Sequence, residues 1–200
     1  MLAKFFSLIL TIYINHQIIN AQRGGPVDCQ KVQSIPKLDV SDFLGTWYIL
    51  AIYPDSTLLS MRCPVVIFTW PAVGANNAQI SVFKKYISFG NEKRVMGSAS
   101  AVGRGTLGIN FPVLPRDNGV YNVLVPGTDY ENYAVLFTCN NYPGYIVGQN
   151  VWVMSRNKTL ESQYWQNVFS TMINNTLPPN FLKLIDQNCN DQFPFVNSGK

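Results

Sequence analysis

The chain has 200 residues, of which 47% are apolar and 13% are charged, with four cysteines and a single histidine. This length suits one domain with a sizeable core, and the apolar and aromatic content excludes an intrinsically disordered chain. The formal net charge of +4 is scattered along the sequence. No basic stripe is present, so we expect no nucleic acid partner.

The first 21 residues have the pattern of a secretory signal peptide. Lys4 precedes the apolar run Phe5–Ile14, and Ala21 is a small residue suited to a cleavage point. The run is too short to span a bilayer, and no second apolar stretch reaches that length, so no membrane span is expected. The remaining residues, 22–200, are predicted to form a single secreted, extracellular domain.

The single histidine, His16, lies inside this predicted leader. Cleavage after Ala21 leaves a chain without histidine. Ser-His-Asp and Cys-His catalysis are then excluded, as are zinc, copper and haem sites with histidine ligands. We therefore expect neither an enzyme nor a metal site.

The cysteines agree with a secreted protein. Cys29, Cys63, Cys139 and Cys189 are far apart and form no CxxC pair. An even number of separated cysteines in a secreted chain indicates structural disulfides rather than a metal or redox site. Two bridges are expected, and the spacing alone leaves their connectivity open.

From Thr46 to Arg156 the sequence consists of short β-rich runs separated by turn residues. Spacings of roughly a dozen residues with turn signals between them indicate an antiparallel sandwich or barrel. Asp117-Asn118-Gly119 is typical of a tight hairpin. The expected strands are Trp47–Tyr53, Val65–Trp70, Gln79–Tyr86, Lys93–Val102, Thr106–Phe111, Val120–Val125, Tyr133–Cys139 and Val151–Arg156.

One later segment has a helical spacing. Between Leu160 and Ile173, apolar residues recur at intervals of three and four, which predicts an amphipathic helix packed on something apolar. Thr159 is expected to cap this helix, and Pro178-Pro179 prevents its continuation. The expected order is a barrel or sandwich over about 45–156, a helix over about 160–174 and a C-terminal tail.

Two short patterns have alternative interpretations. Gly103–Gly108 matches the spacing of a dinucleotide-binding loop, but a strand-like run and Pro112 follow where a helix is required. We therefore interpret these glycines as a tight turn between strands. Asn157 and Asn174 begin N-glycosylation sequons, and Asn174 is the better candidate because Asn157 adjoins the expected helix start.

Three separated motifs are more specific. Gly45-Thr46-Trp47-Tyr48 opens the first strand, Thr128-Asp129-Tyr130 lies between the sixth and seventh strands, and Ser155-Arg156 ends the eighth. In this order and spacing the chain resembles the lipocalin family, over nearly all of the sequence between Cys29 and Cys189. The resemblance implies an all-β fold, an eight-stranded antiparallel up-and-down barrel with one helix packed outside.

Further runs place the resemblance in the branch of apolipoprotein D and the insect bilin-binding proteins. These are Cys29-Gln30-Lys31-Val32, Phe43–Tyr48 and Asn132-Tyr133-Ala134-Val135. This likeness implies the disulfides Cys29–Cys139 and Cys63–Cys189. It also implies structural roles for the motif residues, with Trp47 plugging the closed end of the barrel and Arg156 stacked across its indole. Gly45, Thr128, Asp129 and Tyr130 are expected to maintain the fold.

A barrel of this type has room for one small ligand. Alternation along the strands and the family registration predict an apolar, aromatic interior. Lys84 shares a strand face with Val82 and Tyr86, so it is either solvated at the barrel mouth or a counter-ion for an acidic ligand. The predicted interior residues are Ile49, Ala51, Tyr53, Val66, Phe68, Trp70, Val82, Lys84, Tyr86, Ala134, Leu136, Trp152 and Met154.

These residues predict a secreted carrier of a small hydrophobic ligand, such as a fatty acid, a sterol or a retinoid, with no cofactor. A biliverdin-binding pigment protein is an alternative, although no histidine is available to contact the pigment. An alternative of another class is a secreted effector that binds a protein partner through the loops at Pro54–Arg62 and Asn140–Gln149.

Overall fold

A computed structural model describes residues 31–53, 61–71, 80–111, 120–142 and 145–189. The predicted signal peptide, the Asp117-Asn118-Gly119 turn and Cys29 lie outside these ranges. The described strands are β1 (Gly45–Ile52), β2 (Met61–Thr69), β3 (Ile80–Ser88), β4 (Asn91–Gly103), β5 (Thr106–Asn110), β6 (Val120–Thr128), β7 (Tyr133–Tyr142), β8 (Tyr145–Ser155) and β9 (Lys183–Leu184).

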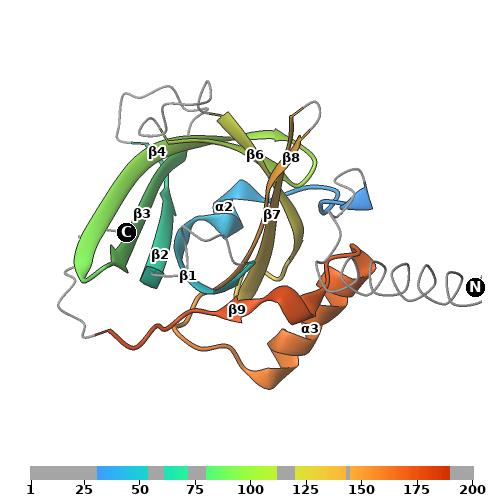
Figure 1. Ribbon diagram of the computed structural model, residues 1–200. Coiled ribbons are helices and arrows are strands. Elements are labelled where there is room, and N and C mark those ends of the chain that lie inside the picture. The colour runs from blue at the N-terminus through green and yellow to red at the C-terminus, as the bar shows by residue number, and fades with distance from the viewer. Residues whose placement is uncertain (1–30, 54–60, 72–79, 112–119, 143–144, 190–200) are drawn as a thin grey trace, which may run out of the picture.

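The first eight strands close into an antiparallel barrel (Figure 1). Each strand from β2 to β7 pairs with the next, β8 pairs with β1, and β1 pairs with β2 to complete the ring. The predicted all-β barrel is confirmed, and each expected strand is present with boundaries that differ by a few residues. Three short elements were not predicted: α2 (Val40–Phe43) before β1, the 3-10 turn η2 (Pro179–Phe181) and the strand β9 that follows it.

The α3 helix (Ser162–Asn174) packs outside the barrel against β6 and β7, as expected. Val168 and Met172 are buried there, whereas Ile173 is 63% exposed, so the apolar stripe is narrower than the sequence indicates. The predicted Thr159 cap is wrong. Glu161 occupies the N-cap position without a side-chain hydrogen bond, and the Thr159 carbonyl instead accepts a hydrogen bond from the Ser155 hydroxyl at 3.3 Å.

A glycine permits the close approach of α3 to the barrel. A Cβ built on Gly127, in β6, would lie 2.8 Å from the side chain of Thr171 on the helix. Beneath α3, side chains on the outer faces of β7 and β8 form an apolar cluster with residues of the helix. Its buried members are Val32, Ala51, Tyr53, Tyr133, Val135, Phe137, Val151, Val153, Val168, Met172 and Leu177, and we call it the outer cluster.

The glycines of the Gly103–Gly108 pattern form a turn between β4 and β5, in agreement with the sequence interpretation. Gly103 has a φ of +114°, which glycine adopts without strain, and the next turn residue, Arg104, has a φ of +41°. A Cβ on Gly105 would lie 2.5 Å from the side chain of Ile35. Packing of the N-terminal segment, rather than a phosphate, accounts for this glycine.

Candidate functional site

One end of the barrel is covered by Trp47, which is fully buried. The guanidinium carbon of Arg156 lies 3.7 Å from the centre of the indole, within the range of a cation–π contact. The indole Nε1 donates to the Phe43 carbonyl at 2.8 Å, so α2, which lies across this end in Figure 1, is attached to the plug. The role implied for Trp47 and Arg156 agrees with this geometry, and we call this end the closed end.

Arg156 also ties three separate segments together. Its Nε donates to the carbonyl of Tyr130 at 2.9 Å, Nη1 to that of Thr46 at 3.1 Å and Nη2 to that of Asp42 at 2.8 Å. Gly45 has a φ of +99°, and a Cβ there would lie 3.1 Å from Nη1. The glycine of the first motif is therefore required both by its backbone conformation and by the arginine beside it.

The Thr128-Asp129-Tyr130 motif forms the β6–β7 turn at the same end. The Asp129 carboxylate accepts hydrogen bonds from the backbone amides of Asn132 and Tyr133 at 2.8 and 2.9 Å. Desolvation would raise the pKa of Asp129, but these bonds outweigh it and the pKa is lowered. The Thr128 hydroxyl donates to the Tyr133 carbonyl at 2.7 Å and accepts from the Tyr130 amide. The motif is thus structural.

Inside the barrel, most of the predicted side chains lie together. The cluster they form, which we call the interior cluster, is apolar, and Tyr86 and Trp152 pack against it while partly exposed. This arrangement agrees with alternation along the strands for the residues concerned. The predicted residues that are buried in the cluster are Ile49, Val66, Phe68, Val82, Ala134, Leu136 and Met154.

The inward placement predicted for Ala51 and Tyr53 is wrong. The register of β1 against β8 shifts between Ile49 and Ala51, because a β-bulge adds one residue to β1. One extra residue reverses the alternation, so both side chains lie in the outer cluster. The Tyr53 hydroxyl donates to the Pro178 carbonyl at 3.0 Å, and Ile52 faces the interior in its place.

The inward placement of Trp70 is also corrected. Trp70 follows β2 and its side chain is 53% exposed. Phe68 pairs with Gly45, so this strand end lies at the closed end. The strand stops one residue before Trp70, and the alternation that places Val66 and Phe68 inside does not extend to it.

Lys84 is the cation on the inner face of β3. It pairs in register with Val66 and Val95, and its Nζ lies 5.2 Å from the centre of the Tyr86 ring. Among the described residues, no carboxylate lies within salt-bridge distance of it. Burial lowers the pKa of Lys84, because a charged ammonium is poorly solvated among apolar side chains.

The adjacent Lys85 shows the contrast between the two faces of β3. Its side chain points to the opposite face, where its Nζ lies 3.3 Å from the Glu92 carboxylate. Glu92 also pairs with Arg94 on that face. Partial desolvation would raise the pKa of Glu92, but the hydrogen bonds and charges of Arg94 and Lys85 outweigh it and the pKa is lowered. The outer lysine thus has an acidic partner in the chain, whereas no described carboxylate pairs with the inner lysine.

Sequence reasoning missed several members and neighbours of the interior cluster, among them the following three. Ile52 and Met61 are buried in the interior cluster, and Ile185, from the C-terminal part of the chain, packs against it. Ile52 was missed because a bulge leaves no mark in the alternation, and Met61 because β2 begins earlier than expected. Ile185 has no periodic signal at all.

The predicted Cys63–Cys189 disulfide is present. Cys139 is also disulfide-bonded, and its predicted partner Cys29 lies outside the described residues. Asn157 and Asn174 are both exposed, so each sequon is accessible. Within the described ranges, no cluster of three or more His, Cys, Asp or Glu residues suits a metal ion, and no described helix is long and apolar enough to cross a membrane.

Residues 44–187 match the model of the lipocalin / cytosolic fatty-acid binding protein family. The chain belongs to the lipocalin family. It is similar to the bilin-binding protein of Pieris brassicae, at 27% identity over 68% of this chain and 70% of that protein. It is also similar to apolipoprotein D of Cavia porcellus, at 24% identity over 76% and 79% of the two chains. The branch inferred from the sequence is therefore confirmed.

Solved structures agree with this lipocalin fold. The insecticyanin structure from Manduca sexta superposes with a TM-score of 0.68 at 21% identity, over 80% of this chain and 87% of that one. Lobster apocrustacyanin A1 superposes with a TM-score of 0.64 at 19% identity, over 76% and 81%. At these sequence identities the similarity establishes the barrel fold and does not identify the ligand.

Proposed function

We propose that this lipocalin is a secreted carrier that binds a small hydrophobic molecule with one acidic group. The apolar part of the ligand contacts the interior cluster, and the acidic group pairs with Lys84. The observation that carries this proposal is the contrast between Lys84 and Lys85, because a lysine on the inner face without a described carboxylate partner suits an anionic ligand. Small-molecule sites commonly combine an apolar lining with a few placed polar groups.

The energetics favour an acid over a neutral ligand. A charged group away from water is costly unless it is paired, and the lowered pKa of Lys84 reflects that cost. A ligand carboxylate restores the partner, and a hydrogen bond to a charged group contributes about 1.5–3 kcal/mol. Fatty acids and retinoic acid have this combination of an apolar body and one carboxylate, whereas a sterol or retinol lacks the anion.

The test compares a ligand acid with its ester. The protein is titrated with the fluorescent fatty acid cis-parinaric acid and separately with its methyl ester, in wild type and in Lys84→Met. We expect Lys84→Met to weaken binding of the acid about tenfold or more and binding of the ester less than twofold, since only the acid loses an ion pair.

The neighbouring lysine supplies the matched control. Lys85→Met removes the same charge from the other face of β3 and should leave both affinities within twofold of wild type. Equal losses for acid and ester in Lys84→Met would reject the ion pair, and the absence of binding by wild type would reject the carrier.

A bilin pigment is the second candidate ligand, because the chain is similar to a protein named for binding bilin. A tetrapyrrole such as biliverdin combines flat apolar rings with carboxylates. Trp152, partly exposed beside the interior cluster, offers a ring to stack on, and Lys84 offers the cation. Protein purified from its source with a visible absorption band would support the pigment, and a colourless bound lipid would support the carrier.

Secretion is part of the proposal and is supported by the Cys63–Cys189 disulfide, since disulfides persist in oxidising compartments. Expression of the whole chain in insect cells tests it. We expect protein in the medium that begins after Ala21, with glycan at Asn174. Protein retained in the cytosol with an intact N-terminus would contradict this prediction.

A further inference from the structure

One edge of β1 has two different neighbours. Along that edge Gly45–Tyr48 pair with β2, whereas Ala51 and Ile52 pair with β9. The β1–β2 ladder therefore stops halfway along β1, and a segment from the C-terminal part of the chain continues it. We call this segment, Lys183–Cys189, the C-terminal strap.

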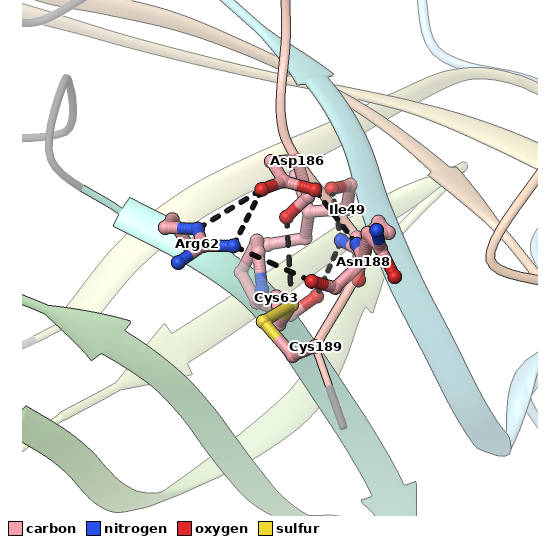
Figure 2. The surroundings of a disulfide bond; sticks show 8 residues. Ile49, Arg62, Cys63, Asp186, Asn188 and Cys189 are labelled. Atoms are coloured by element: carbon pink, nitrogen blue, oxygen red, sulfur yellow. Dashed lines mark hydrogen bonds and ion pairs between the residues drawn. A yellow bond between two sulfur atoms is a disulfide. The ribbon is translucent and has the colours of Figure 1, made fainter. Parts of the chain in front are cut away.

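The strap is bonded to both sides of the split. On the β1 side, the Ile185 amide donates to the Leu50 carbonyl at 2.9 Å. On the β2 side, the Cys63 amide donates to the Asp186 carbonyl at 2.8 Å, and the Cys63–Cys189 disulfide lies next to this bond (Figure 2). Arg62 reinforces the same side, with its Nη2 2.7 Å from the Asp186 carboxylate.

Gln187, in the strap, lies beside the register shifts of both β1 and β2. The register of β1 shifts just after Ile49, and that of β2 shifts between Arg62 and Val65. The buried Gln187 amide donates to the carbonyl of Ile49 at 2.8 Å and to that of Pro64 at 3.3 Å. Bulges leave backbone groups outside the ladder, and this one side chain satisfies a carbonyl beside each bulge.

Ile185 is the part of the strap that reaches the interior. It packs against the interior cluster, to which Ile49 and Ile52 belong. The preceding Leu184 is 76% exposed on the other face of the strap. The strap therefore presents an apolar side chain to the inside of the barrel at the position where a regular β1–β2 ladder would have closed the wall.

We propose that the C-terminal strap is part of the wall of the ligand site, that Ile185 contacts the apolar body of the ligand, and that the Cys63–Cys189 disulfide holds this wall closed. The inference rests on the proposed function and adds a residue from outside the eight strands to the site. Because Ile185, Ile49 and Ile52 are all aliphatic, the part of the ligand at this wall is a hydrocarbon chain or ring rather than a polar group.

The contact is tested with cis-parinaric methyl ester, whose binding does not depend on the Lys84 ion pair. Ile185→Ala removes buried carbons from the wall and should weaken binding about fivefold. Ile185→Trp fills space used by the ligand and should weaken it about tenfold or more. Leu184→Ala is the matched control, since it makes a similar truncation on the exposed face, and its affinity should stay within twofold of wild type.

The closure is tested by the rate of ligand release. In Cys63→Ser/Cys189→Ser, stopped-flow dissociation of the ester should be about tenfold faster, while far-UV circular dichroism reports an intact barrel. Asp186→Asn weakens the ion pair with Arg62 but keeps the disulfide. It should also accelerate ligand release, by a smaller factor than the double cysteine variant. It replaces the double variant if that variant does not fold.

The outcomes separate the two proposals. If wild type binds the ester and both Ile185 variants match Leu184→Ala, the wall contact is overturned. Unchanged release from Asp186→Asn and from a folded disulfide variant overturns the closure. If wild type binds neither the acid nor the ester, the proposed function fails and the wall role fails with it.

Discussion

The two halves of β1 are held in the barrel by different means. In the first half, Gly45–Tyr48 pair directly with β2, and Arg156 covers Trp47 at the closed end. In the second half the β2 partner is absent and the C-terminal strap replaces it. The first half is held by hydrogen bonds from Arg156, one of them to Thr46 across a sequence separation of 110. The second half depends on a covalent link to the strap, a disulfide with a sequence separation of 126.

This difference separates stability from ligand contact. The first half contains the fully buried Trp47, and the carbonyls around it accept hydrogen bonds from Arg156. The second half contains the bulges, the strap and Ile52 and Ile185 at the interior. Variants in the first half should therefore act on the free energy of unfolding, and variants in the second should act on ligand binding as well.

The largest effect is expected from Trp47→Ala. Removing a fully buried tryptophan leaves a cavity and costs about 3–5 kcal/mol, and it also leaves Arg156 without its aromatic partner. Urea denaturation followed by circular dichroism measures the change. Phe169→Ala on α3, where the ring is 39% exposed, is the control and should cost less than about 1 kcal/mol. A comparable loss in the two variants would contradict the plug role.

Ile52→Ala tests the reversed faces of β1. Truncating this buried isoleucine should cost about 3 kcal/mol and weaken binding of cis-parinaric methyl ester, because Ile52 lies in the interior cluster. Tyr53→Phe, its neighbour in sequence, loses only the hydrogen bond to Pro178, costs about 1 kcal/mol and leaves ester binding unchanged. Weaker binding in Tyr53→Phe would restore the simple alternation and refute the bulge.

The second half of β1 also shows which features could be predicted from the sequence and which could not. The barrel, the helix and the closed end follow from features confined to short segments: turn residues between strands, a three-four apolar spacing, and the motifs around Gly45, Asp129 and Arg156. Ala51 and Tyr53 were assigned to the wrong face because a bulge is set by how two strands pair. That pairing is a property of the tertiary structure that one strand's alternation does not contain.

Other parts of the site depend on contacts between distant segments. Lys84 was found from its strand face, since a lysine among alternating apolar residues stands out. Ile185 and Gln187 were not found, because their roles depend on the split between β1 and β2 rather than on their own neighbours in sequence. The end of β2 at Thr69, one residue before Trp70, was also missed, because the strand's own alternation does not mark where its pairing stops.

Arg156→Lys should have the next largest effect, at about 2 kcal/mol. Lysine keeps the positive charge but lacks the planar fork that stacks on an indole while donating to three carbonyls. The control is Arg62→Lys at the strap, an exposed ion pair with Asp186 that contributes less than about 1 kcal/mol. Equal losses in urea denaturation would mean that charge alone, and not the fork geometry, stabilises the closed end.

Acid titration gives the smallest effect and compares the same two halves. The pKa of Asp129 is lowered in the folded state: desolvation would raise it, but backbone and side-chain hydrogen bonds to the carboxylate outweigh that effect. The pKa of Asp186 is lowered by the Asn188 amide and by Arg62. A carboxyl whose folded pKa lies below its unfolded value stabilises the fold above the unfolded pKa, and the contribution is lost as the pH falls through the folded pKa. Both carboxyls therefore stabilise the protein at neutral pH.

The measurement is the urea midpoint of wild type, Asp129→Asn and Asp186→Asn between pH 7 and pH 2.5. Each variant should be less stable than wild type above about pH 5, and the difference should shrink as the pH falls below the ordinary aspartate pKa of about 3.9. Asp129 is partly buried and accepts three hydrogen bonds, whereas Asp186 forms an exposed ion pair with Arg62. Because salt screens exposed charges more strongly, added salt should reduce the stability difference of Asp186→Asn more than that of Asp129→Asn. A pH-independent difference for Asp129→Asn would show that its side chain acts through shape rather than charge.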